Sequence, residues 1–173
     1  MMKPPRLQAL PPLALPQMPA SNRQIMRSHH TPRWAYMLGW LGVIPFVAAA
    51  AGSFSPDPML MQFSAELGAR YGVSIGIFLG AVHWGLALDH HQHATKWRLI
   101  WSVLPSLAGV IIMLMPANAS LGYVIALLGL CWVVDVLIAS MGILPSWYMR
   151  LRHGLTLVAI LSLVVIMFNL SGF

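Results

Sequence analysis

Residues 71–88, which read YGVSIGIFLGAVHWGLAL, contain no charged side chain and decide the fold. An α-helix needs about 20 predominantly apolar residues to cross the roughly 30 Å hydrocarbon core of a bilayer. Four comparable runs lie around this one, so the sequence predicts an all-α integral membrane bundle of five transmembrane helices. The predicted spans cover about 34–54, 71–88, 99–115, 120–143 and 154–172.

The composition of the whole chain excludes an ordinary soluble domain. Charged residues make up 8% of the 173 residues, whereas soluble domains average about 25%. Hydrophobic residues make up 58%, and the mean hydropathy is +0.75. The pI of about 10.3 comes from bases that flank apolar runs, so the expected partner is the lipid bilayer and not nucleic acid. A single cysteine, Cys131, excludes an internal disulfide.

Composition also divides the chain into two parts. Residues 1–32 contain seven prolines, several bases and no acid. This segment is expected to be a disordered, proline-rich basic tail, because it has too little apolar sequence to form a core. Residues 33–173 are the predicted five-helix membrane domain, with connections too short for a separate soluble domain.

The distribution of lysine and arginine predicts the orientation of the bundle. Cytoplasmic segments of membrane proteins carry an excess of these residues. Nine of the ten bases fall in segments that alternate onto one side of the predicted spans: Lys3, Arg6, Arg23, Arg27, Arg33, Lys96, Arg98, Arg150 and Arg152. Arg70 lies on the other side. We therefore expect a cytoplasmic N-terminus and an external C-terminus.

The external segment 55–70 is predicted to be an interfacial helix that leads into the second span. Asp57-Pro58 is typical of a helix start, and Glu66 and Arg70 stand at i,i+4. We expect this helix to lie along the membrane surface and to bend inward near Gly68 or Gly72.

Small residues on the second span predict close helix packing. Gly72, Gly76 and Gly80 recur every four residues, a spacing that lets another helix approach closely. We expect the second and fourth spans to pack through this stripe. His83 follows Gly76 by seven residues and therefore shares its face, which directs the imidazole into the bundle and away from lipid.

Asp135, in the fourth span, is the acid that lies inside a predicted span, and His83 is expected to be its partner. Asp135 lies six residues before Met141 and His83 six residues before Asp89, so both are expected roughly 9 Å from the cytoplasmic ends of their helices. A carboxylate at that depth is costly unless it is hydrogen-bonded. Two interpretations remain open: a structural clasp between helices, or a proton-relay or ligand-binding pair.

The sequence predicts no catalytic residues, no metal and no cofactor. Asp89, His90, His91 and His93 form a short cluster after the second span, with spacing that suits a divalent metal. Membrane di-iron enzymes need several separated histidine clusters, and bis-histidine haem needs two facing intramembrane histidines. Here one short cluster and one intramembrane histidine, His83, are present. Nucleophile, nucleotide-binding and zinc-protease motifs are absent from the sequence.

Several motifs resemble those of a known membrane family. They are FLGAVHWG at 78–85, SVLP at 102–105, Asp135, PSWY at 145–148, Leu151-Arg152 and Leu155-Thr156. These motifs resemble the five-helix membrane family described as domain of unknown function 3429, which has mitochondrial members, from about Pro32 onward. The resemblance implies a bacterial or mitochondrial inner membrane, and it implies no reaction. Of these settings we expect the bacterial inner (cytoplasmic) membrane, with several spans.

Three functions are compatible with these features. We expect a non-catalytic inner-membrane protein, an accessory subunit or assembly factor that packs against other membrane proteins or against a second copy. The alternative is a small ion, proton or ligand carrier that uses His83 and Asp135. The third is a metal-dependent membrane enzyme at the histidine cluster.

Overall fold

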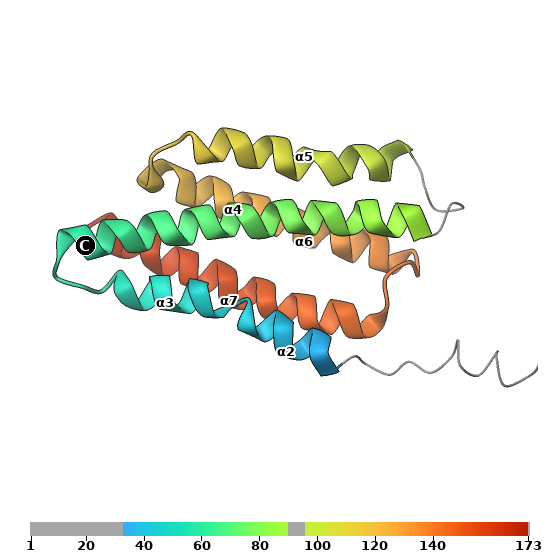
Figure 1. Cartoon of the computed structure of the whole chain (residues 1–173), viewed down its shortest axis with the longest axis horizontal. Helices are drawn as coiled ribbons and strands as arrows, with labels where there is room; N and C mark the ends of the chain where they lie inside the picture. The colour runs from blue at the N-terminus through green and yellow to red at the C-terminus, as the bar shows by residue number, and fades with distance from the viewer. Residues whose placement is uncertain (1–32, 90–95, 173) are drawn as a thin grey trace, which may run out of the picture. The chain divides into compact units, whose positions relative to one another are not determined.

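A computed structural model describes residues 33–89 and 96–172. Its helices are α2 (Arg33–Leu41), α3 (Ile44–Gly52), α4 (Pro58–Asp89), α5 (Lys96–Met113), α6 (Ala117–Ser140) and α7 (Ser146–Leu170) (Figure 1). Together α2 and α3 form one span, and five helical segments are long and apolar enough to cross a membrane. The expected all-α bundle of five such helices is confirmed. The predicted tail, residues 1–32, lies outside the described residues.

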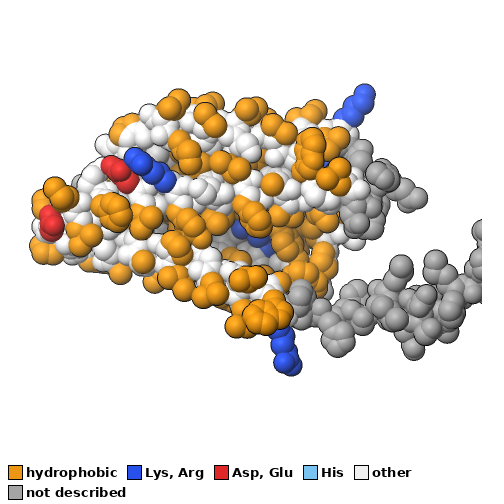
Figure 2. Space-filling view, in the orientation of Figure 1, with side chains coloured by type: hydrophobic (Ala, Val, Ile, Leu, Met, Phe, Trp, Pro, Cys, Tyr) orange, Lys and Arg blue, Asp and Glu red, His pale blue; other side chains and the backbone are white. Residues whose placement is uncertain are grey.

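The outer surface of the described helices matches this assignment. Figure 2 shows hydrophobic side chains spread over the visible face, with acidic and basic groups few and scattered. Large apolar residues such as Trp34, Leu114 and Phe78 are exposed on the surface of the helices. In water such a surface would be unfavourable, whereas lipid chains solvate it well.

The first span is broken between α2 and α3. Pro45 lies in the first turn of α3 and has no N–H with which to continue the helical hydrogen bonds. The chain tightens there, and the Val43 amide bonds the carbonyl of Trp40 at 3.1 Å. The hydroxyl of Tyr71 on α4 donates to the carbonyl oxygen of Gly42 at 2.7 Å, which satisfies a polar group that the break exposes.

Helix α4 begins earlier than the predicted second span. Asp57 caps it by accepting a hydrogen bond from the Met59 amide at 2.9 Å, and Pro58 occupies the first helical position. The helix then continues through Gly68 and Gly72 without interruption. The expected interfacial helix with an inward bend is therefore wrong. Ala65 is fully buried in the bundle, so this segment belongs to the packed part of α4.

Helix α4 packs against α3, α5, α6 and α7, and its glycines permit these close approaches. A Cβ added at Gly72 would collide with Val124 of α6, and one at Gly76 would lie 2.7 Å from Leu127 of the same helix. The expected packing of the second span on the fourth is present at these two positions. Gly80 differs, because its Cβ would lie 2.7 Å from the carbonyl oxygen of Ser102 on α5.

The last helix also begins before its predicted start. Helix α6 ends at Ser140, and the chain turns through Gly142, whose φ of +75° favours glycine. Pro145 then precedes α7, which begins at Ser146 and not near residue 154. The prediction excluded residues 146–153 because they contain two arginines and a histidine. One of those arginines, Arg152, is buried inside the bundle.

Candidate functional site

His83 and Asp135 meet in the interior of the bundle. His83 points inward because it lies on the same face of α4 as Gly76. The absence of a side chain at Gly76 lets Leu127 of α6 pack closely against α4. Each of the two residues is 1% exposed. His83 Nε2 lies 2.9 Å from Asp135 Oδ1. The structure thus places side by side the two residues that were expected to pair because they lie at the same depth in the membrane.

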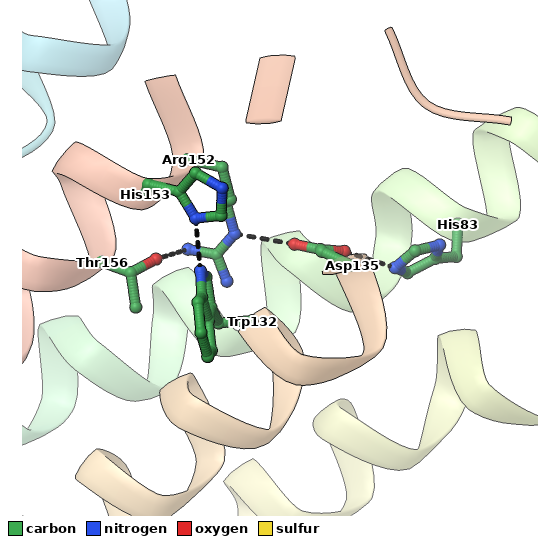
Figure 3. Close-up of polar contacts among 6 residues, drawn as sticks. All are labelled: His83, Trp132, Asp135, Arg152, His153 and Thr156. Atoms are coloured by element: carbon green, nitrogen blue, oxygen red, sulfur yellow. Dashed lines mark hydrogen bonds and ion pairs between the residues drawn. The ribbon is translucent and has the colours of Figure 1, made fainter. Parts of the chain in front are cut away.

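Arg152 of α7 completes this site; from the sequence it was named in a family motif but was not joined to His83 and Asp135. Its Nε donates to Asp135 Oδ2 at 2.7 Å, and its Nη1 donates to the hydroxyl of Thr156, one turn further along α7. The side chains of Arg152 and Thr156 are both buried. Figure 3 shows the resulting chain of contacts from His83 through Asp135 and Arg152 to Thr156, which joins α4, α6 and α7. We call these four residues the polar clasp.

The electrostatics of the polar clasp explain why three helices contribute to it. A carboxylate removed from water needs an opposite charge and hydrogen bonds to both oxygens. Arg152 supplies the charge and bonds one oxygen, and His83 bonds the other. Because an ionised carboxylate can only accept, His83 Nε2 carries the hydrogen of this bond when Asp135 is ionised. Asp135 therefore has no oxygen left unbonded.

Two polar atoms of the clasp have no hydrogen-bond partner among residues 33–89 and 96–172. They are His83 Nδ1 and Arg152 Nη2, and both are inaccessible to solvent. In Figure 3 the third guanidinium nitrogen accordingly carries no dashed line. Buried polar atoms are usually bonded, so these two atoms are the positions at which the clasp has capacity to bind something else.

A cavity of about 390 Å³ adjoins the clasp. Helices α2, α3, α4 and α7 contribute most of its walls, which are mainly apolar, and Arg152 and Thr156 contribute polar groups. In Figure 2 a basic side chain is visible in a hollow between α4 and the α2–α3 segment. Arg152 is the basic residue that lines this cavity, so one end of the clasp borders a space large enough for a small molecule.

A separate polar contact between α6 and α7 involves His153. Trp132 Nε1 of α6 donates to His153 Nδ1 at 2.8 Å (Figure 3). His153 is exposed, unlike its neighbour Arg152, so this contact ties α6 to α7 at the surface.

The metal candidates can be placed only in part. Asp89 is the last residue of α4, whereas His90, His91 and His93 lie outside the described residues. In the described parts of the chain, no three His, Cys, Asp or Glu side chains are grouped closely enough to hold a metal ion.

Arg152 could have been identified from one signal in the sequence. A buried Asp135 needs a cation, and a neutral histidine cannot supply one. Arg152 stands four residues before Thr156, a spacing that places both on one helical face. The sequence interpretation instead placed Arg152 in the connection between the fourth and fifth predicted spans, among the bases that set the orientation.

Comparison with known proteins gives a family and one curated relative. Residues 31–168 match the family model described as "Protein of unknown function (DUF3429)". The chain is also similar to Transmembrane protein 69 of Xenopus tropicalis, with 34% identity over 147 residues. That alignment covers 81% of this chain and 56% of the relative, so the chain spans little more than half of the relative's length. No solved structure matches the chain.

Proposed function

The chain belongs to the DUF3429 family of multi-pass transmembrane proteins, and on that premise we propose that it is a non-catalytic accessory subunit or assembly factor. In this proposal it acts by packing one of its helices against a helix of another membrane protein. A second copy of the chain is the other occupant that the same surface would accept.

The observation that carries this proposal is a row of small residues on the outside of α6. We call Ala119, Gly122, Ala126 and Gly129 the α6 outer stripe. Their spacing places them on one helical face. Ala119, Gly122 and Ala126 are exposed, and a Cβ added at either glycine would have no neighbour within 4 Å among the described residues. Small residues at four-residue spacing favour close helix–helix contact in a membrane, where burial from water supplies no driving force.

Purification in mild detergent tests the proposal. A membrane protein that co-elutes with the wild-type chain should be lost from the double variant Gly122→Ile/Ala126→Ile. The control is Ala48→Ile/Ala51→Ile, which places two isoleucines at exposed alanines of α3. Loss of the partner from both variants, or from neither, would count against the α6 outer stripe. A wild-type dimer that the first variant dissociates would assign the stripe to self-association.

We further propose the bacterial inner membrane as its location, with a cytoplasmic N-terminus. Arg98 and Arg152 are both buried, and removing them leaves seven bases on the proposed cytoplasmic side against Arg70, which still favours that orientation. A reporter fused after Phe173 should be active in the external compartment. Cytoplasmic activity would contradict this topology.

The second candidate function is a carrier for a small ion, proton or ligand. The polar clasp favours it, because ionisable groups inside a membrane often bind or relay a substrate. A transport path would also need polar groups toward the other end of the bundle. In the described residues the core there combines apolar side chains such as Phe46, Leu121 and Ile166 with a few buried serines such as Ser53, Ser64 and Ser120, and it contains no buried ionisable group. Helix packing is therefore the better-supported function.

A further inference from the structure

The cavity beside the polar clasp has the size and lining of a small-molecule site. Its volume of about 390 Å³ lies within the range of roughly 300–1,000 Å³ found for ligand pockets. Four aromatic side chains line it: Phe46, Phe78, Trp147 and Tyr148. Aromatic walls favour a flat ring, because rings stack on one another or meet edge to face.

Arg152 gives the cavity a specific chemical requirement. The residue is 5% exposed, lines the cavity, and has its Nε and Nη1 occupied by Asp135 and Thr156. Its Nη2 has no partner in the described parts of the chain. A buried, charged N–H without an acceptor is unfavourable. Nη2 is inaccessible to solvent in this structure, so the guanidinium must turn toward the cavity before a ligand oxygen can reach it, and that hydrogen bond would then remove the penalty.

The charges of the clasp favour a neutral acceptor over an anion. Asp135 already neutralises Arg152 at 2.7 Å. An anionic ligand would place a second negative charge beside the same guanidinium, and within the clasp only His83 could supply a further positive charge, by protonation. A carbonyl oxygen makes the same hydrogen bond without adding charge.

The depth of Arg152 favours a ring over a lipid ester. Arg152 is the seventh residue of the 25-residue helix α7, and so lies about 9 Å from its start and about 10 Å from its middle. For a helix centred on a hydrocarbon core of about 30 Å, that position is inside the core. Acyl ester carbonyls lie at the edge of the core with the head groups. A lipid-soluble ring can bring its own carbonyl to this depth.

We propose that this cavity binds a quinone, with the ring between the aromatic walls and one carbonyl oxygen accepting a hydrogen bond from Arg152 Nη2. The proposal concerns binding alone and includes no electron transfer. It rests on the cavity and the clasp, so it is independent of helix packing through the α6 outer stripe.

The experiment is calorimetric titration of the purified full chain in mild detergent with decylubiquinone. We expect saturable binding of one molecule per chain. Leu38→Trp fills the cavity from α2 without touching the clasp and should weaken binding at least about tenfold. Leu41→Trp is the matched control, because Leu41 lies on the same helix, is similarly exposed and does not line the cavity. It should leave the affinity unchanged.

A second pair of variants tests the hydrogen bond itself. Arg152→Lys keeps the charge opposite Asp135 but removes the guanidinium fork, and should weaken quinone binding about tenfold. Arg150→Lys changes the exposed arginine of the same helix and should have no effect. If Arg152→Lys does not fold, the Leu38→Trp and Leu41→Trp pair still decides the proposal.

Four results would overturn the quinone site. Decylbenzene, which lacks a carbonyl, would bind as tightly as the quinone if the cavity only accepts apolar bulk. Decanoate would bind more tightly if the acceptor is an anion. Monoolein would displace the quinone at similar concentration if an acyl ester is the true occupant. Equal affinity of the wild-type chain and Leu38→Trp would place any binding outside the cavity.

Discussion

The two glycine-containing faces of α4 and α6 look alike in sequence and differ in use. On α4, side chains or backbone of neighbouring helices occupy the space beside Gly72, Gly76 and Gly80. The same face continues to the buried His83. On α6, Gly122 and Gly129 meet no other residue of the described chain. A small-residue pattern therefore marks a surface that permits close approach. Only the structure tells whether the approaching helix belongs to the same chain.

The largest effect should come from removing Asp135 of α6, which contacts His83 at the end of the α4 face. Asp135→Ala would leave Arg152 buried without its counter-charge, and we expect a loss of about 3–5 kcal/mol in unfolding free energy. Glu66→Ala is the control, because the Glu66–Arg70 ion pair is exposed and contributes at most about 1 kcal/mol. Denaturant unfolding of detergent-solubilised protein measures both. Equal losses would mean that burial of the clasp does not govern stability.

The next effect isolates packing at the two glycine faces. Gly72→Ala and Gly122→Ala add the same methyl group to helical positions, so the gain from helix propensity is common to both. Only the methyl at position 72 meets a neighbour, Val124. We expect Gly72→Ala to be less stable than Gly122→Ala by about 1–3 kcal/mol. A smaller difference, below about 0.5 kcal/mol in thermal unfolding, would show that α4 and α6 can move apart at no cost.

The smallest effect concerns the hydrogen bond between His83 and Asp135. A double-mutant cycle with His83→Ala and Asp135→Ala should give a coupling of about 0.6–2 kcal/mol, as found for hydrogen bonds within membranes. The same cycle on Trp132 and His153 should give less, because that contact is exposed. Asp135→Asn keeps a hydrogen-bonding group and should cost less stability than Asp135→Leu. Additive effects at positions 83 and 135 would mean that the hydrogen bond between them does not contribute to stability.

Much of the fold could be predicted because lipid imposes simple requirements. Runs without charge identified five spans, and Pro45 interrupts the first of them as its chemistry requires. The contact between His83 and Asp135 followed from equal depth and from the need of each group for a partner.

The predictions that failed share one physical cause. Residues 58–70 and 146–153 contain charges, and a charge was taken to end a membrane helix. Arg70, twelve residues into α4, and Arg150, in the second turn of α7, are exposed on their helices, so an exposed charge does not interrupt a helix. Arg152 is tolerated because Asp135 neutralises it. A sequence window that is examined by itself cannot show that a charge in it is neutralised by a residue of a distant helix.

Arg152 is synthesised after the carboxylate that it neutralises. Asp135 precedes it by 17 residues, and a chain is made from its N-terminus. Until α7 enters the membrane, His83 is the hydrogen-bonding partner available to Asp135 from the clasp, and the four earlier spans carry an uncompensated charge. The unfinished chain therefore differs from the finished one by an uncompensated carboxylate in the membrane. We expect the proteases that remove misassembled membrane proteins to recognise this difference. A chain truncated after Ser140 should be degraded faster than the full chain, and Asp135→Leu should prolong the life of the truncated form.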